Sequence, residues 1–192
     1  MPNYRRFYQP GSTVFLTWVT YHRKTLFAES NNIHLFRQAV QRAKSEQPFD
    51  IDAAVILPEH VHFILTFPSN DNDYSKRVGR IKALFTKALK NKDHALTHVS
   101  PSRRKHRESD VWQRRFWEHT IRNEEEYKCY LDYIHYNPVK HGLVRCPHLW
   151  QYSSFHKWVG EGHYCSDWAC QCNGETDFKL RRFEDIALKV GE

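Results

Sequence analysis

The sequence predicts an α+β fold, an antiparallel sheet with helices packed on it, mostly on one face. The first observation is the order of the elements, because segments with strand and helix periodicity follow one another as β-α-β-β-α-β-α. The second is the short link Pro58-Glu59 between two strands, which favours an antiparallel hairpin. The chain has 192 residues, enough to bury a sizeable core.

Three strands and one helix are predicted in the first part of the chain. The first strand covers 14–21, which is rich in β-branched and aromatic residues. A helix begins near Ser30, where apolar residues recur at helical spacing, and it ends at Pro48. Strands over about 50–57 and 60–67 then form the hairpin.

The middle of the chain is basic. A helix with one apolar face is predicted after the loop 68–73. The rest of its surface is cationic, and this surface either is simply exposed to solvent or contacts DNA. Residues 91–110 lack apolar periodicity and are expected to form a basic surface loop. A fourth strand with mixed aromatic and cationic side chains is predicted over 112–121.

A capped helix follows the fourth strand. Asn123 is the expected N-cap, and Glu126 stands in the capping-box position three residues later. Asn137-Pro138 is expected to end or kink this helix, because a residue before proline disfavours the α region. Farther on the chain is aromatic but irregular, with a short charged helix in its last twenty residues.

Composition narrows the functional classes. The net charge is +7 and the pI is near 9.2, while aromatic residues make up 15% of the chain. This suits a nucleic-acid binder, which needs cations for phosphates and rings for unstacked bases, although a merely basic enzyme has the same charge. No apolar run approaches a membrane span, and the N-terminus lacks the apolar core of a signal peptide.

The five cysteines are an odd number without framework spacing, which fits a reducing cytosol and predicts a cytoplasmic protein. Cys165, Cys170 and Cys172, with His163 nearby, are candidate zinc ligands. Their spacing matches no common zinc pattern, so this interpretation is the weaker one.

His60-Val61-His62 is the first candidate for a site. Side chains alternate along a strand, so both imidazoles point to one face and Val61 to the other. The pair is either the start of a divalent metal site or a solvated pair on an exposed face. On the capped helix, Tyr133 and Asn137 lie four residues apart and therefore on one side.

Three blocks carry a family resemblance: 58–62 (PEHVH), 112–122 (WQRRFWEHTIR) and 132–144 (DYIHYNPVKHGLV). With them the chain resembles the REP-associated tyrosine transposases, relatives of the IS200/IS605 transposases within the HUH endonuclease group. The resemblance runs from Tyr4 to about Trp168. It implies a catalytic domain of ferredoxin-like HUH fold over 1–145 and a C-terminal tail over 146–192 that packs on this domain.

The resemblance also implies roles for residues. Tyr133 becomes the nucleophile, whereas Tyr130 and Tyr136 do not, and Tyr136 is expected to point away from the apolar stripe. His60, His62 and Asn137 become ligands of Mg²⁺ or Mn²⁺, which suit mixed nitrogen and oxygen donors. Because a phenol with a pKa near 10 is a weak nucleophile at neutral pH, metal assistance fits the chemistry.

The implied partner is single-stranded DNA beside REP hairpins, in the nucleoid of a prokaryote. The candidate DNA-binding residues, each with ordinary surface charge as the alternative, are Tyr4, Arg5, Arg6, Arg114, Arg115 and Lys140. The basic segment 91–110 is longer than in compact relatives, and our hypothesis is that it clamps the hairpin backbone. The resemblance favours a monomer and leaves a dimer open.

Two other functions are kept open by the sequence. One is a hairpin-binding regulator with an idle nuclease centre, and the other is a metal hydrolase that uses water, with Tyr133 only structural.

Overall fold

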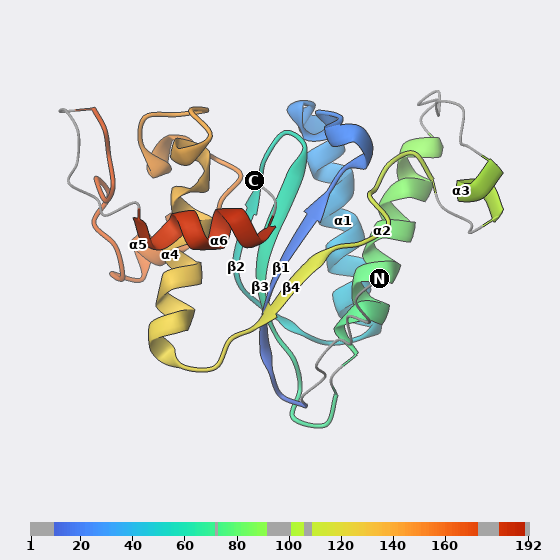
Figure 1. Ribbon diagram of the computed structural model, residues 1–192, viewed down its shortest axis with the longest axis horizontal. Helices are drawn as coiled ribbons and strands as arrows, with labels where there is room; N and C mark the ends of the chain where they lie inside the picture. Colours follow the sequence, from blue (N-terminus) through green and yellow to red (C-terminus); the bar gives the residue numbers. More distant parts are fainter. Residues whose placement is uncertain (1–9, 72, 92–100, 106–108, 173–180, 191–192) are drawn as a thin grey trace.

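A four-stranded antiparallel sheet lies at the centre of the molecule (Figure 1). This computed structural model describes residues 10–71, 73–91, 101–105, 109–172 and 181–190. The strand order is β2-β3-β1-β4, and all neighbouring strands are antiparallel. The strands are β1 (Thr13–Val19), β2 (Asp50–Ile56), β3 (His60–Thr66) and β4 (Trp117–Thr120).

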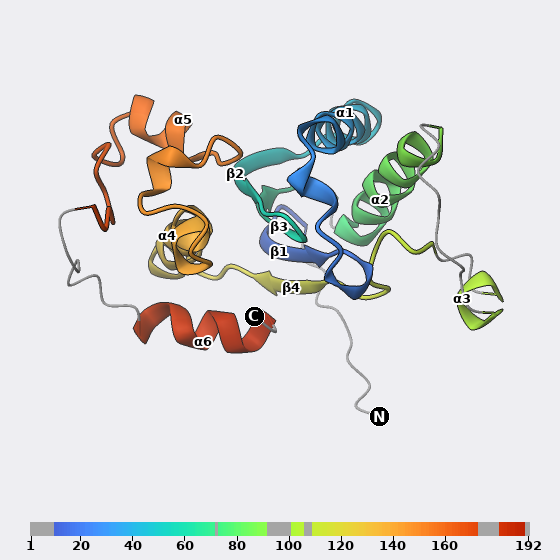
Figure 2. The same cartoon turned by 90° about the horizontal axis from the view of Figure 1, so that it is seen from above.

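Helices cover both faces of this sheet (Figure 2). The long helices α1 (Ser30–Glu46) and α2 (Tyr74–Lys90) pack on one face. On the other face lie α4 (Glu124–Lys140) and α6 (Arg181–Val190). The shorter described elements are η1 (Tyr21–Arg23), η2 (Leu26–Ala28), α3 (Pro101–Lys105), η3 (Pro147–Leu149) and α5 (Phe155–Gly160).

The α+β class is confirmed, but the expectation that helices lie mostly on one face is wrong. The alternation along the central strands gives the reason. On β1, Leu16 and Trp18 enter the core under α1 and α2, while Phe15 enters the core under α4. Both faces of the central strands are therefore buried, and each needs its own layer of helices.

The start of α4 follows the capping prediction closely. The Asn123 side chain accepts a hydrogen bond from the Glu126 backbone N–H at 2.8 Å. The Glu126 carboxylate reaches back to the N–H of Arg122 at 2.7 Å, one residue before the cap. Three acidic residues in the first turn add a favourable interaction with the helix dipole.

Of the two outcomes predicted at Asn137-Pro138, an end or a kink, the end is wrong, because α4 continues through Pro138 to Lys140. Pro138 and Val139 are buried, so packing offsets the hydrogen bond that proline cannot make. Gly142, at φ +66°, then turns the chain out of the helix. The Leu143 N–H donates to the Pro138 carbonyl at 2.9 Å and closes this last turn.

Two other expectations need correction. The fourth strand is shorter than 112–121; Trp112 makes only an isolated bridge with Thr20 before β4 begins at Trp117. The segment 91–110 is not entirely loop, because α3 lies within it, whereas 92–100 and 106–108 lie outside the described residues. In the part of the chain that the structure describes, no helix could cross a membrane.

Candidate active site

The two histidines of β3 are fully buried beneath α4. Their ring centroids lie 4.9 Å apart, and both rings project to the face opposite Val61 and Phe63, as the strand alternation predicts. Complete burial excludes the alternative of a solvated pair. A buried imidazole pair needs polar partners, and the neighbouring residues supply them.

One nitrogen of each ring is held by a neighbour. His60 Nδ1 lies 3.1 Å from the Glu59 carboxylate, which lowers the pKa of Glu59 chiefly through this hydrogen bond. His62 Nδ1 lies 2.9 Å from the Thr17 hydroxyl, on the paired position of β1. A proton on Nδ1, donated to such a partner, leaves the lone pair on Nε2, the arrangement that metal-binding histidines use.

Helix α4 faces both imidazoles along one side. The Tyr133 ring lies 5.5 Å from the His62 ring, and the His141 ring lies 5.1 Å from the His60 ring. Asn137 stands four residues from each, so it occupies the same side of the helix between them. The helix thus brings an amide over the gap between the two histidines.

The Asn137 side chain provides a test of whether the site suits a metal. It is fully buried, and neither amide atom has a hydrogen-bond partner among the described residues. Buried amides are nearly always hydrogen-bonded, so this one requires an explanation. An ion bound to Oδ1, together with the two Nε2 atoms, would satisfy the amide oxygen, and the donor set therefore fits a divalent metal.

Tyr133 is fully buried beside this donor set. Lys140 Nζ donates a hydrogen bond to the Tyr133 hydroxyl at 3.2 Å and lies 5.2 Å above the ring centroid. On its outer side the ring contacts Phe183 of α6 at 5.9 Å between centroids. Helix α6 lies across α4 (Figure 1) and shields the phenol from solvent.

The two neighbouring tyrosines of α4, Tyr130 and Tyr136, are also buried. Burial raises the pKa of Tyr130 and that of Tyr136. Tyr136 is expected to point away from the apolar stripe, yet it is packed as well: its hydroxyl accepts a hydrogen bond from Gln171 and its ring stacks on Phe183. The C-terminal segment supplies the second apolar surface, which helix periodicity alone does not show.

Among the described residues, the candidate DNA-binding residues Arg114, Arg115 and Lys140 lie in different surroundings. Tyr4, Arg5 and Arg6 lie outside the described residues. Arg114 and Arg115 are exposed between Trp112 and β4 but line different pockets. Lys140 instead points its ammonium at Tyr133, within the core of the site.

The pocket of about 430 Å³ that Arg115 lines lies beside the buried histidines. Thr17, which contacts His62, forms part of its wall, together with Trp117 of β4 and Val190 at the end of α6. This pocket reaches the edge of the site from the β4 side of the sheet.

Several site residues were missed by sequence reasoning. Glu59 directly precedes His60, so its proximity was readable from the chain. His141 is one turn beyond Asn137, and the same helical periodicity could have found it. The contact of Thr17 with His62 could be found only from the pairing of β1 with β3, which no local sequence pattern predicts.

Comparison with known proteins identifies the family of this chain. Residues 10–137 match the family described as "Transposase IS200 like". The chain therefore belongs to the IS200-like transposase family, as its motifs predict. The REP-associated tyrosine transposase of Escherichia coli (strain K12) is 40% identical over 180 residues, 93% of this chain and 95% of the relative.

A Haemophilus influenzae protein with the same designation, given provisionally, is 39% identical over 181 residues, 94% of this chain and 98% of the relative. A solved structure of a REP-associated tyrosine transposase bound to a REP hairpin has a TM-score of 0.75 and 40% identity. It covers 93% of this chain and 95% of its own. Within the family, the chain is thus a member of the REP-associated tyrosine transposases, and it is an enzyme.

Proposed function

We propose that this transposase cleaves and rejoins single-stranded DNA beside REP-type hairpins through a 5′-phosphotyrosine intermediate on Tyr133. The observation that carries the proposal is the position of Tyr133, whose ring contacts His62 and whose hydroxyl accepts a hydrogen bond from Lys140. The substrate is inferred from the similar structure bound to a REP hairpin.

The chemistry is a transesterification. The Tyr133 oxygen attacks phosphorus and loses its proton, the new bond joins Tyr133 to the 5′-phosphate, and the 3′-oxygen leaves as a hydroxyl. Lys140 stabilises negative charge on the phenol oxygen as this proton departs. Because the phosphodiester energy is retained in the tyrosine ester, the 3′-hydroxyl of another strand can reverse the step and join two ends.

His60, His62 and Asn137 would hold the divalent metal, Mg²⁺ or Mn²⁺, in this proposal. When bound, the ion supplies Lewis-acid stabilisation of charge on the scissile phosphate. Glu59 and Thr17 orient the two imidazoles through their Nδ1 atoms. The metal set and the nucleophile come from one chain, which supports activity as a monomer.

A basic groove lined by α2, by Arg103 and by residues within 109–114 is the proposed contact for the hairpin stem. Its volume is about 610 Å³, and its cationic lining residues are Lys82, Lys87, Lys90, Arg103 and Arg114. Arg103 donates to the carbonyls of Ser109 and Trp112, so it builds the wall of the groove. Lys87 and Lys90 are exposed and suited to phosphate contacts.

One experiment separates this proposal from its alternatives. Labelled single-stranded REP hairpin DNA is incubated with the protein and Mg²⁺ or Mn²⁺, and the products are separated on a denaturing gel. We expect a covalent protein–DNA adduct that disappears in Tyr133→Phe and persists in the matched control Tyr136→Phe. Cleavage that continues in Tyr133→Phe would indicate water as the nucleophile, and binding without any cleavage would indicate an idle centre.

The groove has its own test. Replacing Lys87 and Lys90 with Gln should flatten the slope of log affinity against log salt by about 0.9 for each phosphate that the variant no longer neutralises. Lys157→Gln, at an exposed position of α5, serves as the control. If the salt dependence of hairpin affinity is unchanged in the double variant, the hairpin does not bind in this groove.

A further inference from the structure

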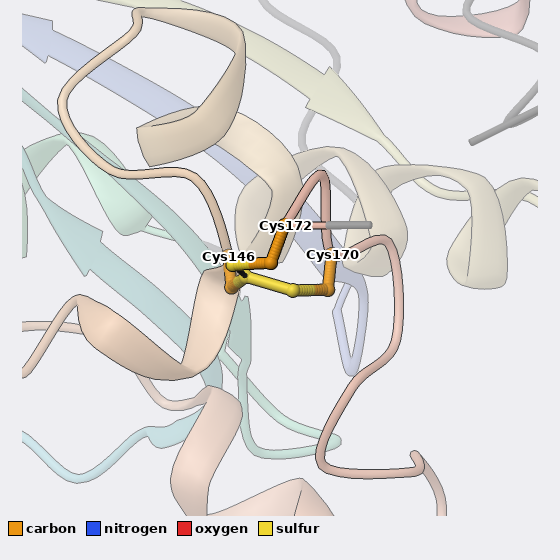
Figure 3. A group of neighbouring side chains, drawn as sticks. All are labelled: Cys146, Cys170 and Cys172. Atoms are coloured by element: carbon orange, nitrogen blue, oxygen red, sulfur yellow. Dashed lines mark hydrogen bonds between the residues drawn. A yellow bond between two sulfur atoms is a disulfide. The ribbon is translucent and has the colours of Figure 1, made fainter. Parts of the chain in front are cut away.

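Three cysteine sulfurs converge outside the transposase site (Figure 3). The Sγ atoms of Cys146, Cys170 and Cys172 all lie within 4.8 Å of one another. Cys146 and Cys170 are joined as a disulfide, and Cys172 Sγ lies 2.9 Å from Cys146 Sγ. The cluster differs from the set considered from sequence, because it includes Cys146 and omits the exposed Cys165.

The backbone around Gln171 is what gathers these cysteines. The Gln171 N–H donates to the Arg145 carbonyl at 2.9 Å, and its side chain donates to the Tyr136 hydroxyl at 3.0 Å. Because Gln171 is fixed to the end of the α4 region, the cysteines on either side of it are both brought to Cys146. Figure 3 shows the three side chains turned toward one another.

The turn that leads into the cluster is also constrained. Ala169 has φ +52°, a left-handed conformation that is unfavourable for a residue with a Cβ atom. Such a residue persists where its surroundings determine the path of the chain. Here the turn directs Cys170 back toward Cys146, which is fully buried.

We propose that, in the reduced protein, Cys146, Cys170 and Cys172 bind one Zn²⁺ ion as thiolates. A disulfide accounts for two of the three sulfurs and gives no role to the third, whereas a soft divalent ion uses all three. Tetrahedral zinc with Zn–S bonds of about 2.3 Å places its sulfurs about 3.8 Å apart, within the span of this cluster. Cys172 is exposed, so the fourth position faces solvent, where water can bind.

The disulfide and the metal site are alternative states of the same sulfurs. A low-molecular-weight thiol reduces the Cys146–Cys170 bond, with two equivalents oxidised to their own disulfide and two cysteine thiols formed. Zinc then displaces three thiol protons, one from each cysteine. In either state the cluster ties the chain just after α4 to the segment that precedes α6.

The test measures metal content and does not depend on DNA cleavage. Full-length protein is purified with a thiol reductant, stripped with a chelator, reloaded with Zn²⁺ and analysed by mass spectrometry for metal stoichiometry. Co²⁺ is loaded in parallel, because thiolate coordination gives charge-transfer absorption that reports the number of sulfur ligands. We expect this thiolate absorption, at the intensity of three sulfur ligands, in the wild type and in the controls Cys129→Ser and Cys165→Ser; an ion held by His60, His62 and Asn137 adds to the metal content but not to this absorption.

The cluster variants provide the decisive comparison. Cys172→Ser removes a ligand and leaves the Cys146–Cys170 pair intact, so the fold is kept while zinc affinity falls at least tenfold. Its circular dichroism and melting temperature are compared with those of the wild type to verify folding. Absence of the thiolate absorption from the reduced, Co²⁺-loaded wild type, or an equal absorption in Cys172→Ser, would overturn the proposal.

Discussion

Lys140 Nζ lies 3.2 Å from the hydroxyl oxygen of Tyr133, seven residues earlier on the same helix. Seven residues are close to two helical turns, so α4 itself holds the ammonium over the phenol. In the proposed reaction, the positive charge lies where negative charge would develop on the Tyr133 oxygen as it attacks phosphorus. The proposal therefore gives Lys140 a role in the chemical step, whereas the sequence predicts a surface DNA contact.

Replacing Lys140 with Met should slow the chemical step. A hydrogen bond to a charged group contributes about 1.5–3 kcal/mol, which corresponds to roughly a ten- to hundredfold lower rate at saturating DNA. Hairpin affinity should remain near that of the wild type. Single-turnover cleavage and equilibrium binding measure the two effects, and Lys128→Met on the exposed side of α4 is the control. If Lys140→Met instead weakens hairpin binding and leaves the cleavage rate at saturating DNA unchanged, Lys140 contacts DNA and does not assist the chemical step.

Replacing Asn137 with Leu should abolish metal binding and raise the stability of the metal-free protein. Leaving a buried polar group unsatisfied costs about 1–3 kcal/mol, so an apolar side chain of similar size should raise the free energy of unfolding by about that amount in chelator. Addition of Mn²⁺ should then raise the melting temperature of the wild type but not of the variant. Thermal unfolding with and without Mn²⁺ measures both effects.

A second buried asparagine provides the matched control. The Asn32 amide donates to the Leu26 carbonyl at 2.8 Å, so Asn32→Leu should destabilise the fold and keep the response to Mn²⁺. If Mn²⁺ stabilises Asn137→Leu as much as the wild type, Asn137 is not a ligand.

Local patterns were sufficient for much of the fold and for part of the site. Alternation along β3 placed His60 and His62 on one face, and the cap at Asn123 positioned the start of α4. Helical periodicity then put Asn137 near Tyr133. These relationships depend on residues close in sequence, where the geometry of a strand or helix is fixed.

Relationships between distant segments could not be predicted in this way. The Thr17 contact with His62 depends on the register of β1 against β3. The cover over Tyr133 depends on a helix about fifty residues away, and Phe183 carries no local signal of its partner. Pro138 stays helical because tertiary packing outweighs a local preference.

Opening the contact between α6 and α4 should accelerate DNA cleavage. The phenol of Tyr133 is fully buried and its ring contacts Phe183, so the proposed attack on a phosphate would require this helix to move. Phe183→Ala removes the ring and should raise the single-turnover rate several-fold, because weaker packing makes α6 easier to displace. Hydrogen exchange of α6 amides should increase in parallel.

Leu188 offers a matched control on the same helix, since its side chain is 77% exposed. Leu188→Ala should leave both the cleavage rate and the hydrogen exchange of α6 unchanged. If Phe183→Ala binds DNA fully but cleaves it no faster than the wild type, α6 does not limit the access of DNA to Tyr133.

His135 should make the stability of this fold depend on pH. It is fully buried on α4, and burial lowers its pKa to about 3, from an ordinary value near 6.5. Between these values the unfolded chain binds the proton and the folded chain does not. The free energy of unfolding therefore falls as the pH decreases below about 6.5, and this loss continues down to about pH 3.

The contribution of His135 can be isolated with His135→Phe. Between pH 7.5 and pH 5.5 this residue should lower the free energy of unfolding by about 1.4 kcal/mol in the wild type and by nothing in the variant. The Ser154 hydroxyl, which lies 2.9 Å from the ring, keeps its hydrogen bond from the Ala54 N–H in both proteins. Urea unfolding at the two pH values measures the difference, since other titrating groups contribute equally. If the free energy of unfolding depends on pH in the same way in the wild type and in His135→Phe, His135 can be protonated in the folded protein.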